Sequence, residues 1–157
     1  MAARAHDGPP LALLLLLASR WFDAQSLDRL EERGWPRLSP PQSLVFAYLN
    51  VSGTRPAELA RRLGSTRQAT HELVAGLVRL DLLEVAADPS RRNGKLVRPT
   101  SRGLDLTRDA YGILRELEDS AFGARRSQTL RRLLADFGSR HPLVHPAVRP
   151  VPTAPPS

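Results

Sequence analysis

Residues 55–80 read RPAELARRLGSTRQATHELVAGLVRL. Proline is common in the first turn of a helix and glycine just after its end, so Pro56 and Gly64 bound a short predicted helix over residues 56–63. After a tight turn, apolar residues recur at helical spacing and predict a second helix over residues 66–80. Two helices joined by a tight turn that contains glycine form a helix-turn-helix.

The first turns of the second helix carry polar side chains, and its apolar side chains lie on the other face. A helix that enters the major groove of DNA needs hydrogen-bonding groups early and core anchors late, which matches this order. The residues here predicted to contact DNA are Ser65, Thr66, Arg67, Gln68, Thr70 and His71. The alternative for them is an ordinary solvated face. Arg61 and Arg62 are expected to point away from the core, toward phosphates or toward solvent.

Two short apolar stretches follow and predict a β-hairpin. Residues 82–86 read LLEVA, residues 95–98 read KLVR, and the loop between them ends in Asn-Gly, a pair typical of hairpin turns. A hairpin with consecutive arginines in its loop, placed directly after a recognition helix, is a wing that lies along the DNA backbone or enters the minor groove. The wing residues predicted to contact DNA are Arg91, Arg92 and Lys95.

Further helices are predicted on both sides of this segment. Residues 39–42 read SPPQ, which supplies a capping serine, a first-turn proline and a capping-box glutamine. Apolar residues at helical spacing predict a long helix over residues 102–122 and a last helix over residues 127–137. Near the N-terminus, residues 11–18 read LALLLLLA, and the apolar pattern continues to Leu30.

The leucine run is too short to span a bilayer and close to the lower limit for a secretory signal. We therefore interpret it as part of a buried structural helix, with export as the alternative. A single chain would expose this run to water, and an exposed apolar patch of that size indicates a partner.

Composition supports one soluble domain with an anionic partner. The chain has 157 residues, 41% hydrophobic and 25% charged, and no cysteine, which excludes a disulfide scaffold, a thiolate zinc site and a cysteine nucleophile. The net charge is +7, and residues 54–103 hold ten basic and five acidic residues. A cationic footprint concentrated in the middle of the chain is typical of a nucleic-acid-binding module.

Nothing in the sequence indicates an enzyme or a cofactor. We find no Gly-rich phosphate loop, no Ser-His-acid grouping and no cluster of carboxylates. His141 and His145 have a spacing that suits a metal on a helix, but Pro142 and Pro146 interrupt any helix there, so no metal site is expected.

Residues 55–64, 73–84 and 88–103 resemble the MarR family of winged-helix transcription regulators, and the run from the wing to Thr-x-x-Gly is the most specific part. The resemblance covers residues 11–138. It implies a homodimer with interlocking N- and C-terminal helices, a winged helix on each subunit, and a phenolic or other small ligand that relieves repression. The residues assigned to dimer contact on this basis are Leu14, Leu17, Trp21, Leu114, Leu117, Leu130 and Leu134.

The sequence departs from the family pattern in the wing and the recognition helix. Arg91 stands where the family usually has a second wing acid, which helps to hold the arginine retained here as Arg92. This predicts a freer wing with more phosphate attraction and less sequence discrimination. Asn93 replaces a frequent basic residue, Glu72 stands where the family often has arginine, and Asp81 replaces a common glycine.

The expected fold is mainly α with a small β-hairpin wing, a winged helix-turn-helix whose N- and C-terminal helices form a dimerisation region. The predicted parts are a disordered N-terminus (1–10), a MarR-like domain (11–138) with dimerisation helices (11–37 and 104–138) around a DNA-binding region (39–103), and a disordered proline-rich tail (139–157).

The expected function is that of a cytoplasmic homodimer that binds double-stranded DNA at a pseudo-palindromic operator. It would regulate transcription as a ligand-responsive repressor, with a small-molecule effector and no membrane partner. Two alternatives stay open: a winged-helix protein-interaction module that has lost DNA binding, and a secreted or membrane-tethered protein that uses the leucine run for export.

Overall fold

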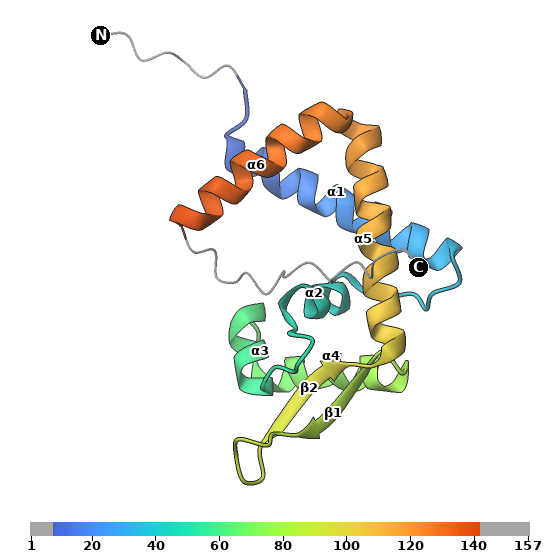
Figure 1. Ribbon diagram of the computed structural model, residues 1–157, viewed down its shortest axis with the longest axis vertical. Helices are drawn as coiled ribbons and strands as arrows, with labels where there is room; N and C mark the ends of the chain where they lie inside the picture. The colour runs from blue at the N-terminus through green and yellow to red at the C-terminus, as the bar shows by residue number, and fades with distance from the viewer. Residues whose placement is uncertain (1–7, 142–157) are drawn as a thin grey trace, which may run out of the picture.

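The computed structural model describes residues 8–141, which form helices and one hairpin. In chain order these are α1 (Leu11–Glu32), α2 (Pro40–Tyr48), α3 (Pro56–Leu63), α4 (Arg67–Arg79), β1 (Leu83–Ala87), β2 (Lys95–Pro99), α5 (Ser101–Phe122) and α6 (Ala124–Arg140). Figure 1 shows α2, α3, α4 and the hairpin at one end of the molecule and α1 with α6 at the other, with α5 running between them. We call residues 38–100 the winged-helix region and α1, α5 and α6 the outer helices. The predicted mainly helical fold with a hairpin wing is confirmed.

Local signals in the sequence set the helix ends. The Gln42 Oε1 accepts a hydrogen bond from the Ser39 backbone N–H at 2.9 Å at the start of α2. The Thr66 Oγ1 accepts from the Ala69 N–H at 3.1 Å and caps α4. Gly64 ends α3 with φ 61°, a left-handed conformation that glycine adopts without steric cost. The helix-turn-helix bounds are accordingly those predicted, within one residue at each end of α4.

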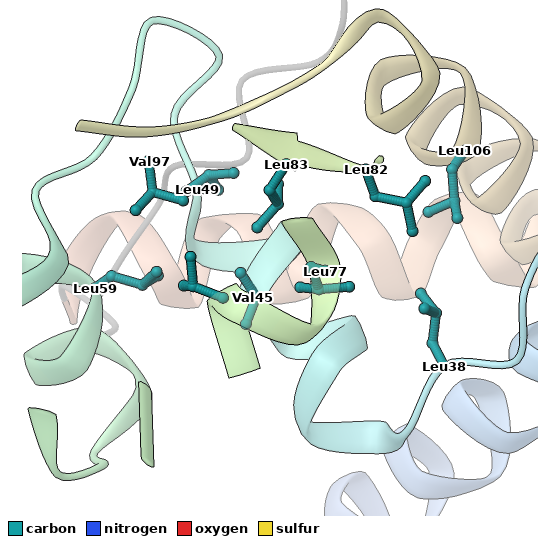
Figure 2. Packing of buried hydrophobic residues seen from close by; sticks show 10 residues of the cluster. Leu38, Val45, Leu49, Leu59, Leu77, Leu82, Leu83, Val97 and Leu106 are labelled. Carbon is teal, nitrogen blue, oxygen red and sulfur yellow. The ribbon is translucent and has the colours of Figure 1, made fainter. Parts of the chain in front are cut away.

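The main core lies in the winged-helix region and extends to the start of α5. Figure 2 shows leucine and valine side chains from α2, α3, α4, the hairpin and the start of α5 meeting at its centre. The buried members are Leu38, Val45, Leu49, Leu59, Val74, Leu77, Leu82, Leu83, Val97 and Leu106. Because all of these elements share one set of buried contacts, the recognition helix and the wing are held in a fixed relation to each other.

The hairpin is antiparallel, with Leu83 opposite Pro99 and Ala87 opposite Lys95. An isolated bridge between Thr54 and Val97 ties β2 to the segment that precedes α3. The base of the wing is therefore joined to the helix-turn-helix through the backbone as well as through the core.

The Thr-x-x-Gly run joins the hairpin to α5. The Thr100 Oγ1 donates to the Asp81 carbonyl oxygen at 2.7 Å and accepts from the Gly103 N–H at 3.0 Å. A Cβ on Gly103 would lie 2.0 Å from the Leu82 carbonyl oxygen, so only glycine fits there. Asp81 itself has φ 57°. Aspartate tolerates this left-handed conformation, which accounts for its presence where the family commonly has glycine.

The leucine run is not buried in the chain, which corrects the expectation of a buried helix. Leu11 is 70% exposed, Leu15 is 41% exposed, and the other leucines of the run fall between these values. The buried residues of α1 are Ser26 and Leu30, in its second half, where it packs against α5. The first turns of α1 have no such neighbour among residues 8–141. No helix in this part of the chain has the length and apolar character needed to cross a membrane.

The last helix is longer than expected at both ends. α6 begins at Ala124 and ends at Arg140, beyond the predicted span 127–137 and the predicted domain end at residue 138. The segments predicted to be disordered, 1–10 and 139–157, lie for the most part outside the described residues, as does His145.

Candidate nucleic-acid interface

A concave groove of about 1020 Å³ lies between α4 and the wing. We call it the wing–helix groove. Apolar residues, including Ala75, Val78 and Val85, form part of its lining. Its cationic residues are Arg55, Arg67, Arg79, Arg91 and Lys95. The arrangement gives an apolar surface with guanidinium and ammonium groups around it, which suits a polyanion with flat apolar bases.

The structure places three of the predicted α4 contacts on this groove. Arg67, Gln68 and His71 are exposed and line it. Thr66 is exposed too, but its hydroxyl oxygen is engaged as the cap of α4. Ser65 is half-buried in the turn between α3 and α4.

Thr70 does not belong to this surface, so its assignment as a DNA contact is wrong. Its side chain is 1% exposed, and its Oγ1 has no hydrogen-bond partner in the described part of the chain. Thr70 lies four and seven residues before Val74 and Leu77, which are also buried, so all three share the core-facing side of α4. The prediction followed the polarity of the residue and not its angular position.

The base of the wing is fixed by a buried carboxylate, which the sequence analysis missed. Asp88 has a side chain that is 4% exposed, and its Oδ2 accepts from the Arg55 Nε at 2.8 Å. The other carboxylate oxygen accepts from the Ser90 backbone N–H at 2.9 Å and the Ser90 hydroxyl at 2.7 Å. These hydrogen bonds, from Ser90 first and then from Arg55, lower the pKa of Asp88 to about 2.

This contact changes the expectation of a freer wing. Arg55 also donates to the Ser90 Oγ at 3.0 Å, so the residue just before α3 holds the start of the wing loop. Arg91 and Arg92 are exposed and form no ion pair with residues 8–141. The loop base is therefore fixed, and its arginine side chains project from it. The sequence signals for this contact were Arg55, just before α3, and the Asp-Pro-Ser turn that begins at Asp88. They are far apart in the sequence, and only the fold brings them together.

The two arginines of α3 have different roles. Arg62 has a side chain that is 12% exposed; its Nε donates to the Glu58 Oε1 at 2.8 Å and its Nη1 to the Tyr48 carbonyl oxygen at 2.9 Å. The expectation that Arg62 points away from the core is therefore wrong. Arg61 is exposed and also binds Glu58, and its hydrogen bond is the main cause that lowers the pKa of that carboxyl.

The residues assigned to dimer contact fall into two groups. Five of them, on α1 and α6, are at least 40% exposed: Leu14, Leu17, Trp21, Leu130 and Leu134. Leu117 is 2% exposed and packs with Leu30 and Ile113 between α1 and α5, so its assignment to a partner contact is wrong. Leu114 is half-buried.

Leu114 lines a smaller cavity of about 180 Å³ between α1, α2 and α5. Its walls are mainly apolar, with polar groups from Asp23, Ser43 and Tyr111. The Ser43 hydroxyl donates to the Asp23 Oδ1 at 2.8 Å. Within residues 8–141 there is no group of three or more potential metal ligands.

Comparisons with known proteins agree with this geometry. Residues 38–92 match the model of the MarR family. No curated protein matches the chain in sequence. The fold is similar to that of RV1404 from Mycobacterium tuberculosis, at 25% identity and TM-score 0.64, over 87% of this chain and 98% of that one.

Two further solved structures have the same fold. Reduced MarR from E. coli has 20% identity and TM-score 0.67 over 84% of this chain and 98% of that chain. A mutant of MepR from S. aureus, bound to an oligodeoxyribonucleotide, has 18% identity and TM-score 0.56 over 85% of this chain and 99% of that one. The family match spans the helix-turn-helix and the start of the wing, and the structural matches extend over the outer helices. Residues 38–92 of the chain therefore match the MarR family, and the chain has the winged-helix fold of the solved MarR and MepR structures.

Proposed function

We propose that this protein is a dimeric, sequence-specific DNA-binding repressor that acts in the cytoplasm, has no enzymatic activity and responds to a small-molecule effector. The observation that carries the proposal is the wing–helix groove, in which polar and cationic side chains from α4 and from the wing face one concave surface.

The size of α4 suits the major groove of a DNA duplex. α4 has 13 residues and is about 20 Å long. The major groove of B-DNA is about 12 Å wide and admits one helix. With the exposed face of α4 in the major groove, Arg67, Gln68 and His71 reach base edges or phosphates. The arginines of the wing then reach the flanking backbone or minor groove. That a MepR mutant of the same fold was solved with an oligodeoxyribonucleotide supports DNA as the ligand.

The exposed apolar residues of α1 and α6 support a homodimer. An apolar surface of this extent costs free energy in water, and a second copy of the chain offers the matching surface. A two-fold axis through these helices presents two copies of α4 to one side of a duplex. The operator would then be pseudo-palindromic, with half-sites about 10 bp apart.

The small cavity between α1, α2 and α5 supports an effector site. It lies where two outer helices meet the helix that precedes the helix-turn-helix, so a ligand there can change the angle between the two regions. Its apolar walls and few polar groups suit a small aromatic molecule with one or two hydrogen-bonding groups. A ligand that favours one angle over another shifts the two α4 helices out of register with the operator, which releases DNA.

The test is a titration of labelled duplexes by fluorescence anisotropy at several salt concentrations. One duplex carries the DNA upstream of the protein's own gene and the other a scrambled sequence. We expect a dissociation constant that rises steeply with salt for both, and tighter binding to the upstream fragment. Sedimentation of the same sample should give a dimer.

Two results would count against the proposal. Failure to bind any duplex at about 50 mM salt, where phosphate contacts are strong, would favour a protein-interaction module. Equal affinity for both duplexes, together with equal affinity for fragments selected from the whole genome, would remove sequence specificity.

A further inference from the structure

The exposed face of α4 carries an acidic residue within a surface that is otherwise cationic. Glu72 is exposed, and the Gln68 Nε2 donates to its Oε1 at 3.0 Å from one helical turn earlier. A carboxylate only accepts hydrogen bonds, so this contact requires the amide nitrogen of Gln68 to face Glu72. The carboxylate is therefore oriented by a neighbour on its own helix.

Both residues lie on the side of α4 that faces away from the core. Thr70, Val74 and Leu77 are buried and mark the opposite side. With 3.6 residues per turn, Gln68 and Glu72 lie roughly opposite that buried side. Gln68 lines the wing–helix groove, and Glu72 lies beside that groove without lining it. The outward side of α4 enters the major groove if α4 acts as the recognition helix.

An acid in this position opposes DNA binding in general. Among residues 8–141, Glu72 forms no ion pair that would neutralise it, and DNA phosphates repel it. The repulsion applies to every sequence. A compensating hydrogen bond is available only where a base presents a donor to the free carboxylate oxygen.

The bases differ in what they present. In the major groove guanine and thymine offer acceptors, O6 with N7 and O4, which a carboxylate cannot use. Cytosine offers its N4 amino group and adenine its N6 amino group. The adenine amino group lies beside the N7 acceptor, which repels a carboxylate, whereas the cytosine amino group lies beside a C5–H. Cytosine is thus the base that best matches Glu72.

We propose, on the basis of the proposed DNA-binding function, that Glu72 is a specificity-determining residue that accepts a hydrogen bond from the N4 amino group of one cytosine in each operator half-site. Gln68 is its positioning residue, because its amide donates to the carboxylate and orients it on the outward side of α4.

The experiment is selection of bound duplexes from a pool with a random central segment, followed by sequencing, for the wild type and four variants. Wild type should enrich cytosine at one position of each half-site, with about tenfold weaker binding when that base is changed. With Glu72→Gln, the loss of affinity on changing that base should fall to about twofold. The affinity of this variant for scrambled DNA should rise, because a charge that repels phosphates is lost. Glu72→Arg should convert the preference at the same position to guanine, because arginine donates to O6 and N7.

Glu32→Gln, the same change at an exposed position at the end of α1, is the control and should keep the wild-type preference. Circular dichroism melting checks that each variant is folded. Because Gln68 orients the acid, Gln68→Ala should lower the cytosine preference at the Glu72 position without changing the base preferred there.

The outcomes separate the two proposals. If neither wild type nor the variants retain any duplex, the proposed function is overturned. If wild type selects an operator but Glu72→Gln and Glu72→Arg select the same one, the function stands and the assignment of Glu72 is overturned. Retention of duplexes by wild type without any base preference also overturns the assignment.

Discussion

The winged-helix region and the outer helices differ in how much of their apolar surface a single chain buries. In the winged-helix region, ten leucines and valines form one core, nine of them from this region and Leu106 from the start of α5. In the outer helices, the buried cluster holds only Leu30, Ile113 and Leu117, and most of the leucines of α1 and α6 face outward. The core of the winged-helix region is covered within one chain, whereas α1 and α6 leave an apolar face exposed.

This difference separates two roles within one chain. A DNA-binding surface made of a helix and a wing needs these two parts held in a fixed relation, and a shared, well-packed core holds them so. A pairing surface must remain open until a partner covers it. Substitutions in one region at a time test whether the two roles are separate.

The largest expected effect is on the stability of the closed core. Leu77→Ala removes a fully buried side chain at the centre of the winged-helix region. We expect the free energy of unfolding to fall by about 3 kcal/mol, through lost burial and the cavity left behind, as measured by urea denaturation. The control is Val78→Ala, at the next position in α4, where the side chain is 39% exposed. It should change the free energy of unfolding by about 0.5 kcal/mol or less. Equal losses for both would show that this core is not the main source of stability.

The next effect is on association of the outer helices. Leu134→Asp places a charge in the exposed apolar face of α6. Burying it against a partner without a counter-charge costs about 3 kcal/mol, so the dimer dissociation constant should rise by about 100-fold in sedimentation equilibrium. The winged-helix core should remain folded by circular dichroism. Gln128→Asp introduces the same charge on the polar side of α6 and should leave association unchanged. If both variants sediment as the wild type does, pairing through α6 is excluded.

A smaller effect is expected at the tip of the wing. Arg92→Ala removes an exposed guanidinium outside the core, so stability should not change. Affinity for every duplex should fall by about tenfold, and the slope of log affinity against log salt should decrease by about 1 for each subunit. Arg55→Ala is the informative comparison, because Arg55 positions the wing base: it should lower affinity while leaving most of the slope in place. An unchanged slope for Arg92→Ala would contradict the wing assignment.

The smallest expected effect is the contribution of Asp88, at the base of the wing, to the loss of folding stability in acid. The Asp88 pKa is lowered from 3.8 to about 2 in the folded chain. A lowered folded-state pKa stabilises the fold above the unfolded value, and the stabilisation is lost as the pH falls through the folded value. Between about pH 4 and pH 2 the melting temperature of the wild type should therefore fall further than that of Asp88→Asn. The additional fall in the wild type is the part that protonation of Asp88 causes. Parallel pH profiles for the two proteins would remove Asp88 as the cause.

Local chemistry made the helix-turn-helix and the hairpin predictable. Pro56, Gly64 and the Thr66 cap act within a few residues, so their effects do not depend on the rest of the fold. The Asn-Gly pair of the wing loop is equally local, and Asn93 adopts the left-handed conformation, φ 60°, that such turns use. Element types and most bounds followed from these signals.

The errors concern which way individual side chains face. Thr70 was assigned to the DNA surface on its polarity and Leu117 to the dimer surface on its apolar character, but both are buried within one chain. Arg62 was expected to point away from the core, toward phosphates or solvent, but it binds the Tyr48 carbonyl oxygen. Residue type gives an average preference for surface or interior, and the packing of neighbouring elements decides each case.

The amino-acid sequence was enough to predict a winged helix with a cationic surface in the middle of the chain, because caps, glycines and helical spacing act over short distances. Tertiary structure decided how the wing is held. Arg55 and Asp88 are separated by 33 residues and meet only because β2 returns beside the start of α3. It also decided that the leucine run stays exposed in a single chain: a pattern can mark residues as apolar, but only the positions of the other helices determine which of them are covered.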